Sequence, residues 1–227
     1  MKYQWITRGE GKVLVILAGW ATDYRIFSGL PTHRPVMIIE DYDPFLLSEE
    51  LPALFENEGV ILPDLLGFSM GGYVALDFCL QYPEDFSHLI LVGMRPKYPK
   101  KELTYFLNHL GPTKVKKLLE GFYQAAFVAP FYEIGTPLIS QYLTHFSADQ
   151  LRSGIEYLQE FGHLGSIDEL PSDRVSFFHG REDAIAPFAE LDAFLQERDF
   201  KVFCFEGAGH VLSDTIDVSV ILECLGL

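Results

Sequence analysis

The feature that most constrains the fold is a Gly-Phe-Ser-Met-Gly-Gly run at residues 67–72. It overlaps the short apolar segment 64–68, which is typical of a buried strand, and leads into residues 70–82, whose apolar spacing predicts a helix. A Gly-x-Ser-x-Gly pattern between a strand and a helix indicates a sharp turn that exposes the hydroxyl of Ser69. An inert serine in a glycine-rich turn would give the same pattern, so the motif needs chemical partners elsewhere in the chain.

Strand-like and helix-like segments alternate at both ends of the chain, which predicts a mostly parallel α/β sheet covered by helices on both faces. The expected strands are residues 12–17, 36–39, 64–68, 88–93, 175–179 and 201–205, and the main expected helices are 48–58, 70–82, 187–198 and 214–224. Between residues 95 and 165 only helical periodicity remains. We therefore expect a core of residues 1–94 and 166–227, with residues 95–165 inserted as a helical cap over one end of the sheet.

Two later loops carry polar groups that could act on Ser69. A serine hydroxyl is a weak nucleophile until a base takes its proton, and that base needs an orienting carboxylate. Asp183 follows the expected strand 175–179, and His210 follows the expected strand 201–205 in a Gly-Ala-Gly-His loop. The chain order serine, acid, histidine is the one found with this turn, and strand ends of a parallel sheet share one edge. The sequence thus predicts a catalytic triad of Ser69, Asp183 and His210.

Glu182 is the alternative acid, although the Gly-x-x-Asp spacing of residues 180–183 favours Asp183. Of the seven histidines, only His210 lies in a glycine-flanked loop after a late strand. His179 closes a strand and is expected to be structural, packed beneath the acid loop. The remaining histidines are expected on the surface or in the cap.

A serine hydrolase also needs two N–H donors that stabilise the oxyanion. The first expected donor is the backbone N–H of Met70, the residue after the serine. The second is the backbone N–H of Trp20, in the loop 18–21 after an early strand, where Gly19 lets the backbone turn toward Ser69 and the substrate. The Trp20 side chain can serve as a core aromatic at the same time.

The composition excludes several classes of protein. With 17 basic and 32 acidic residues the chain has a formal net charge of −15, which argues against general nucleic-acid binding. The three cysteines have no metal-ligand spacing, the N-terminus lacks an apolar signal core, and no segment reaches the ~18 apolar residues needed to cross a bilayer. We expect a cytoplasmic monomer with no metal, no organic cofactor and no membrane association.

Together these loops resemble the α/β-hydrolase superfamily over nearly the whole chain and, within it, the pimeloyl-acyl-carrier-protein methyl ester esterases of biotin synthesis. That family carries a His-Gly-Trp-Gly loop, a Gly-x-Ser-Met-Gly-Gly turn, a Gly-x-x-Asp loop and a Gly-x-x-His loop. The chain matches at 19–20, 67–72, 180–183 and 207–210, and departs at Ala18 and Ala21. The resemblance implies a Ser-His-Asp carboxylesterase that cleaves the methyl ester of a pimeloyl group on an acyl-carrier protein.

Other activities stay open at this stage. The same turn and triad suit a small-molecule carboxylesterase, a thioesterase or a lactonase, and a similar Ser-Met-Gly-Gly turn occurs in a menaquinone-pathway synthase that eliminates pyruvate. A non-catalytic binding protein is the alternative from another class, but a binding protein has no need for all three triad groups.

The cap segment suggests how a substrate is selected. Phe122, Phe127 and Phe131 could line an apolar acyl pocket, or could form the core of the cap itself. Seven basic residues and one acid lie between positions 95 and 117, giving this window +6 against −21 for the remainder. The window is either a solvated face or a docking surface for an acidic carrier protein. Its basic members are Arg95, Lys97, Lys100, Lys101, Lys114, Lys116 and Lys117.

Overall fold

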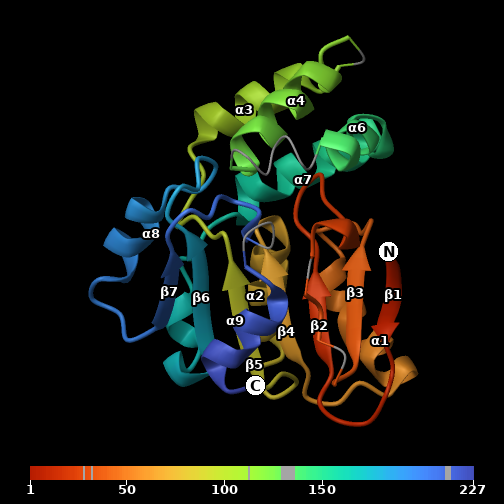
Figure 1. The fold of residues 1–227 in the computed structure, drawn as a ribbon, viewed down its shortest axis with the longest axis vertical. Helices are drawn as coiled ribbons and strands as arrows, with labels where there is room; N and C mark the ends of the chain where they lie inside the picture. Colours follow the sequence, from red (N-terminus) through yellow and green to blue (C-terminus); the bar gives the residue numbers. More distant parts are fainter. Residues whose placement is uncertain (28, 32, 112, 129–135, 213–215) are drawn as a thin grey trace.

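The computed structural model describes residues 1–27, 29–31, 33–111, 113–128, 136–212 and 216–227. In this part of the chain seven strands form one sheet in the spatial order β1-β3-β2-β4-β5-β6-β7 (Figure 1). β1 runs antiparallel to β3, and the other neighbours are parallel. The strands are β1 Lys2–Thr7, β2 Leu14–Leu17, β3 Val36–Glu40, β4 Asp64–Phe68, β5 His88–Val92, β6 Val175–Gly180 and β7 Lys201–Phe205.

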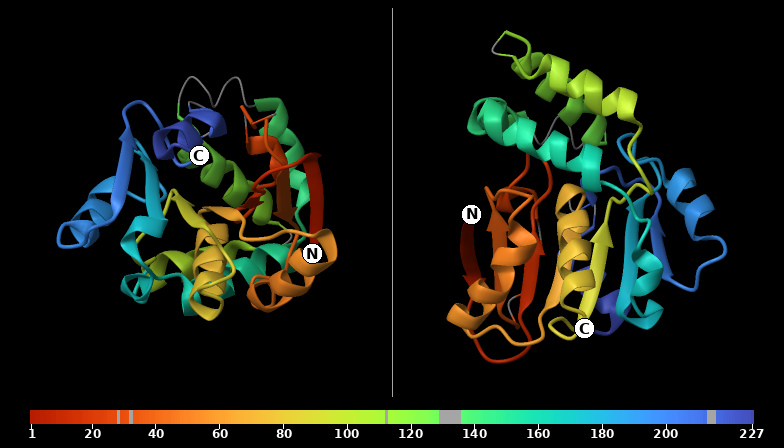
Figure 2. Two further views of the ribbon diagram at one scale, coloured as in Figure 1. Left: turned by 90° about the horizontal axis from the view of Figure 1, so that it is seen from below. Right: turned by 180° about the vertical axis from the view of Figure 1, so that it is seen from behind.

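The central strands are continuous apolar runs because helices cover the sheet on both sides. All residues of β2 and β4 are buried. Figure 2 shows helices α1 and α2 on one face and α9 on the other. The core helices are α1 Leu47–Glu58, α2 Met70–Gln81, α8 Phe188–Leu195 and α9 Val218–Leu225, with short 3₁₀ turns at Tyr24–Ile26, Ile167–Glu169 and Ser172–Arg174. The predicted α/β architecture is confirmed, with each of the six expected strands ending within two residues of its predicted limits.

The antiparallel edge strand β1 is absent from the prediction. Its residues are exposed or half-buried, and it joins the sheet by pairing with β3 through a register irregularity between Trp5 and Thr7. A half-exposed edge strand needs no apolar run, so the segment gives no strand signal of the kind that marks β2 to β5.

Among the described residues between 95 and 165, four helices lie above the sheet, toward the arrowheads of the parallel strands in Figure 1. They are α3 Lys100–His109, α4 Val115–Ala126, α6 Thr136–His145 and α7 Ala148–Phe161. α7 starts with a capping box in which Ser147 and Gln150 bond each other's backbone, and it packs on α3 and on the core helix α2. These helices come from the segment expected to form the cap; the division of the chain at residues 95 and 165 stays a prediction.

Candidate active site

Ser69 occupies the turn between β4 and α2, in a backbone conformation that residues other than glycine rarely adopt. Its φ is 51° and its ψ is −118°, and its N–H donates to the carbonyl of Val92 at 2.8 Å. A Cβ at Gly67 would lie 2.4 Å from the Cα of Gly72, and one at Gly71 would lie 2.3 Å from the Leu17 carbonyl oxygen. Only glycine therefore fits beside the serine, as the motif predicts. Strain retained at a buried position is typical of a functional residue.

The three predicted triad residues form one hydrogen-bonded chain. The Ser69 hydroxyl lies 3.0 Å from His210 Nε2, and His210 Nδ1 lies 2.8 Å from Asp183 Oδ2. All three side chains are buried. The backbone N–H groups of Ile185 and Ala186 both donate to Asp183 Oδ1, at 2.8 and 2.7 Å. The carboxylate is thereby fixed in orientation, with its other oxygen facing the imidazole.

The surroundings of Asp183 favour its ionised form. Burial by itself raises the pKa of this carboxyl, but the charge and hydrogen bond of His210, together with His179 and the Ala186 N–H, outweigh burial and lower the pKa. Glu182, the alternative acid, is exposed to solvent one residue earlier. The local geometry thus selects Asp183 as the partner of His210.

His179 lies directly beneath the acid loop, as the sequence predicts. Its Nε2 is 2.6 Å from the Ala186 carbonyl oxygen and 3.4 Å from Asp183 Oδ2. Burial lowers the pKa of His179, so the ring is neutral and donates its Nε2 proton to that carbonyl. Its role is to support the loop that carries Asp183.

The loop after β2 brings Trp20 next to Ser69. Gly19 is in close contact with Phe68, since a Cβ at this position would lie 2.9 Å from the Phe68 carbonyl oxygen. Within the described residues, neither the Trp20 nor the Met70 backbone N–H donates a hydrogen bond, so both are available to an oxyanion. The Trp20 indole N–H donates to the Leu151 carbonyl of α7 at 2.8 Å, which ties the loop to the cap.

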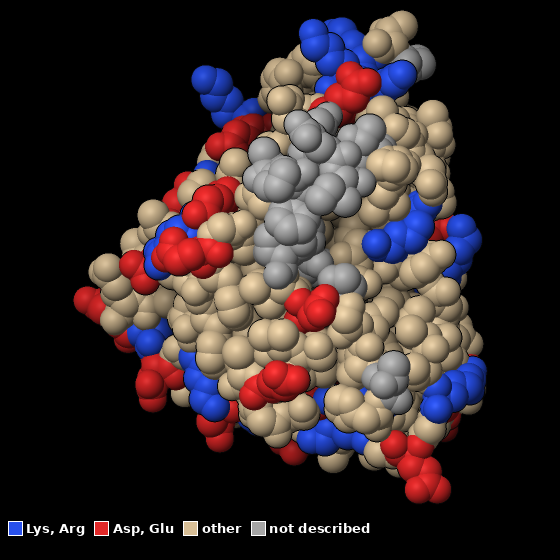
Figure 3. All heavy atoms as spheres, in the orientation of Figure 1, with Lys and Arg blue, Asp and Glu red and all other residues tan. Residues whose placement is uncertain are grey.

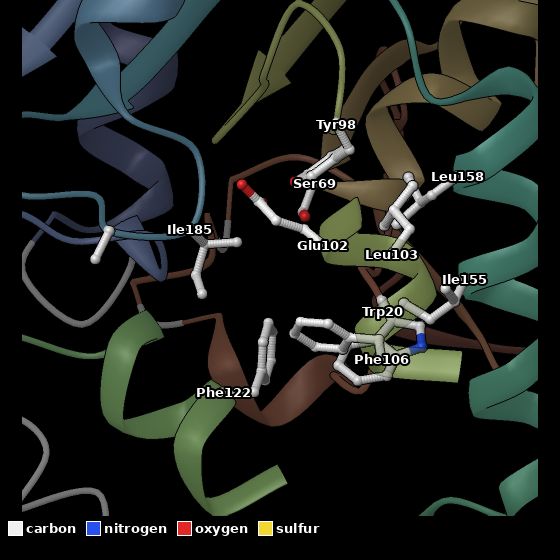
Figure 4. A pocket seen from close by; sticks show the side chains of 11 residues that line it. Trp20, Ser69, Tyr98, Glu102, Leu103, Phe106, Phe122, Ile155, Leu158 and Ile185 are labelled. Carbon is white, nitrogen blue, oxygen red and sulfur yellow. The ribbon is translucent and has the colours of Figure 1, made fainter. Parts of the chain in front are cut away.

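A cavity of about 210 Å³ opens at Ser69 between the core and the cap (Figure 4). Its lining is mostly apolar and comes from the loop after β2, helices α3, α4 and α7, and the acid loop. The lining residues are Trp20, Ser69, Tyr98, Glu102, Leu103, Phe106, Phe122, Ile155, Leu158, Ala184 and Ile185.

The predicted substrate-binding residues lie at different places relative to this cavity. Phe122 lines it. Phe127 is buried but is not among its described lining residues, and Phe131 lies outside the described residues. Gly19 is not among the described lining residues of this cavity and lines a separate small cavity. Most other lining residues, such as Leu103 and Phe106 of α3, belong to no sequence motif, and their apolar spacing indicates only a buried helix face.

Tyr98 is the functional candidate that the sequence analysis missed. It lines the cavity beside Ser69 (Figure 4), and burial raises its pKa above that of a free tyrosine. The hydroxyl is therefore neutral. A tyrosine six residues after a strand end has no distinctive spacing, so sequence offered no signal for it.

The basic window differs from its prediction at one residue. Arg95 is buried and bonds Glu102 at 2.7 Å and Glu190 at 2.6 and 2.7 Å, so it is not part of an exposed docking surface. A count of charges along the sequence cannot detect that this arginine is buried and paired with two glutamates. The six lysines of the window are exposed. Figure 3 shows basic side chains at the outer end of the cap, while acidic side chains are frequent over the core.

The cap also contacts the histidine loop. The backbone N–H of Val211 donates to the carbonyl of Ala126, at the end of α4, at 3.0 Å. A Cβ at Gly209 would lie 2.9 Å from Val128. The chain leaving α4 is therefore packed against the residues on both sides of His210.

Across the described ranges, no three His, Cys, Asp or Glu side chains are grouped so as to hold a metal ion. Nor does any helix in them combine the length and apolarity that a membrane span requires.

Comparisons with known proteins agree with this geometry. Residues 39–99 match a family model described as "Putative esterase". The chain is 25% identical to a pimeloyl-acyl-carrier-protein methyl ester esterase of Aromatoleum aromaticum, over 92% of this chain and 96% of that protein. It is 29% identical to the enzyme of the same name from Aeromonas salmonicida, over 84% of each. Among solved structures, an esterase from Exiguobacterium antarcticum superposes with a TM-score of 0.78 at 18% identity, over 99% of this chain and 92% of that one.

Proposed function

We propose that the chain, which has the α/β-hydrolase fold and is similar to pimeloyl-acyl-carrier-protein methyl ester esterases, is a serine carboxylesterase acting on such an ester. The observation that carries the proposal is the hydrogen-bonded Ser69–His210–Asp183 chain, in a strained turn at the edge of an apolar cavity. A binding protein would need the cavity but not this proton-transfer geometry.

The geometry supports acyl transfer in two steps. The Ser69 oxygen attacks the ester carbonyl while its proton passes to His210 Nε2, 3.0 Å away. The N–H groups of Trp20 and Met70 stabilise the oxyanion that forms. Collapse of this intermediate expels the alcohol, which takes the proton from His210. A water molecule, deprotonated by His210, then attacks the acyl-enzyme; the acid is released and Ser69 recovers its proton.

Features of the cap support the proposal that the substrate is linked to a carrier protein. Two of the helices that line the cavity, α3 and α4, also carry four of the exposed lysines, so a carrier docked on the lysines would lie close to the cavity. Lys116 and Phe122 are both on α4, six residues and hence about 9 Å apart along the helix axis. An acidic carrier protein would be attracted to this end of the molecule and repelled by the acidic core.

The first experiment tests the nucleophile with a fluorophosphonate probe and with hydrolysis of p-nitrophenyl esters. Ser69→Ala should abolish labelling and lower kcat by roughly 10⁴- to 10⁶-fold. Ser176→Ala is the matched control, because Ser176 is also buried and bonds a histidine, His88, at 3.0 Å, but does not line the cavity. Labelling of the Ser69→Ala protein, or residual turnover within tenfold of the wild type, would refute the proposed mechanism.

The second experiment tests carrier docking. Converting Lys114, Lys116 and Lys117 to Glu should lower kcat/KM for a methyl-pimeloyl carrier substrate by at least about tenfold and remove most of its salt dependence. Hydrolysis of a small neutral ester should stay within about threefold, since docking charges act on association and not on chemistry. Equal losses on both substrates would instead indicate a collapsed cap.

A single-site comparison controls for net charge. Lys116→Glu and Lys201→Glu change the charge equally, but Lys201 begins β7 at the end of the sheet remote from the cap. Only Lys116→Glu should slow the carrier substrate. If neither variant does, the lysines are a solvated face, and a small-molecule carboxylesterase becomes the better proposal.

A further inference from the structure

The loop that presents the Trp20 N–H contains an unusual backbone angle. Gly19 to Thr22 form a turn in which the Thr22 N–H donates to the Gly19 carbonyl at 3.3 Å and the Thr22 hydroxyl donates to the same oxygen at 3.0 Å. Ala21 has a φ of +55°, whereas Trp20 is not among the residues with positive φ. This is the pattern of a type II turn, whose third position normally requires glycine.

Alanine is disfavoured at that position because its Cβ crowds the backbone at positive φ. The neighbouring sequence departs here from the family it resembles, which has glycine after the tryptophan. Something outside the turn must therefore stabilise the conformation of Ala21.

That contact comes from the cap. The hydroxyl of Tyr123, on α4, donates to the Ala21 carbonyl at 2.6 Å across 102 residues of sequence. Burial raises the pKa of Tyr123, so the hydroxyl keeps its proton and remains a donor. The ring is fully buried, stacked on Tyr142 at 5.5 Å and packed edge-on against Phe122 at 5.3 Å. Tyr123 has little freedom to leave the carbonyl.

We propose that Tyr123 is a positioning residue that holds Ala21 at positive φ and so aims the Trp20 N–H at the oxyanion. The inference rests on the proposed function, in which Trp20 is an oxyanion donor. The indole of Trp20 is held separately, by the Leu151 carbonyl and by Phe106 and Phe122. Loss of the Tyr123 hydroxyl would therefore turn the loop backbone while leaving the cavity wall in place.

The test is a double-mutant cycle between Tyr123 and Ala21, read as kcat and KM on a small neutral ester. Tyr123→Phe should lower kcat by about tenfold, below the 10²- to 10³-fold loss of a whole oxyanion donor, with KM changed less than about twofold. In the Ala21→Gly background, where positive φ is free of strain, the same substitution should lower kcat by less than about threefold.

A transition-state analogue gives an independent measurement. The inhibition constant of a trifluoromethyl ketone, which forms an oxyanion on the serine, should rise by the same factor as kcat falls. Tyr142→Phe is the matched control: it removes the adjacent buried hydroxyl, which bonds Asp23 at 2.7 Å and not Ala21. It should show no coupling to Ala21→Gly, and thermal melting of each variant reports whether it is folded.

Three results would overturn the inference: an unchanged kcat in Tyr123→Phe, an equal loss in both backgrounds, or a loss confined to KM. These outcomes differ from failure of the proposed function. If Ser69→Ala retains labelling and turnover, there is no serine oxyanion to stabilise. If Ser69 is essential but Tyr123 is uncoupled from Ala21, only the positioning role is wrong.

Discussion

Replacing Asp183 with asparagine tests the triad without changing its shape. Both backbone donors of the acid loop, Ile185 and Ala186, bond the same oxygen, Oδ1, so the amide oxygen must occupy that position. The amide NH₂ then takes the place of Oδ2, 2.8 Å from His210 Nδ1. It donates to Nδ1 and leaves the imidazole proton on Nε2, facing Ser69. In this tautomer His210 cannot accept the serine proton.

The size of the effect follows from the alternative amide orientation. Turning the amide over would restore the imidazole tautomer but would leave two buried N–H groups without an acceptor, at about 1–3 kcal/mol each. A cost of about 2–6 kcal/mol corresponds to roughly 30- to 3 × 10⁴-fold, at 1.36 kcal/mol per tenfold. Losing the negative charge beside the imidazolium adds to this, so we expect kcat to fall by about 10³- to 10⁴-fold.

The assay is kcat for a p-nitrophenyl ester, with circular dichroism melting to show that the fold persists. Glu182→Gln is the control, because that side chain is exposed one residue away and should cost less than about twofold in kcat. Retention of kcat within tenfold in Asp183→Asn would refute the tautomer argument. A large loss in Glu182→Gln with none in Asp183→Asn would reverse the assignment of the acid.

Three further substitutions probe the surroundings of the site. Gly71→Ala should lower the free energy of unfolding, measured in urea, by about 1–3 kcal/mol, because the new Cβ would lie 2.3 Å from the Leu17 carbonyl oxygen. Gly121→Ala in α4 is the control and should not destabilise the protein, because the space around its new Cβ is open. Glu102→Gln should raise kcat/KM for an ester with an anionic acyl chain, relative to kcat/KM for a neutral ester, by about three- to tenfold. The reason is that Arg95, Glu102 and Glu190 together give this wall of the cavity a net negative charge. An unchanged ratio would show that Glu102 has no influence on the acyl chain. Burial lowers the pKa of His88 in the folded state, so on acidification below about pH 6.5 the unfolded state binds the proton first and stability falls. The melting temperature of His88→Gln should therefore fall less than that of the wild type between about pH 7 and pH 5. An equal fall would show that His88 does not cause the loss of stability in acid.

The triad could be predicted from sequence because each of its members lies in a loop with its own local signature. The glycines at 67 and 71 are required by close backbone contacts that any such turn must make. Asp183 and His210 follow strands, and parallel strands end at a common edge. Strand β1 was not predicted, because an edge strand exposed on one side needs no apolar run.

The cavity could not be predicted in the same way, because its lining is set by how the cap helices pack on the core. Phe122 and Phe127 are five residues apart, and the first lines the cavity while the second does not. Two further contacts join residues that are distant in the sequence: Tyr98 lies beside Ser69 in the cavity wall, and Arg95 bonds Glu190, 95 residues later. Composition and periodicity predict which face of a helix is apolar, but not which residues that face contacts.

The contact between α4 and the histidine loop has a consequence for exchanging lids between hydrolases. The Ala126 carbonyl accepts the N–H of Val211, and Val128 packs where Gly209 lacks a side chain. A transplanted lid whose last helical turn ended one residue earlier would remove this acceptor and shift the loop that carries His210, the proposed general base. Chimeras in this scaffold should therefore be joined beyond Val128, so that the native end of α4 is kept and specificity can change without loss of proton transfer.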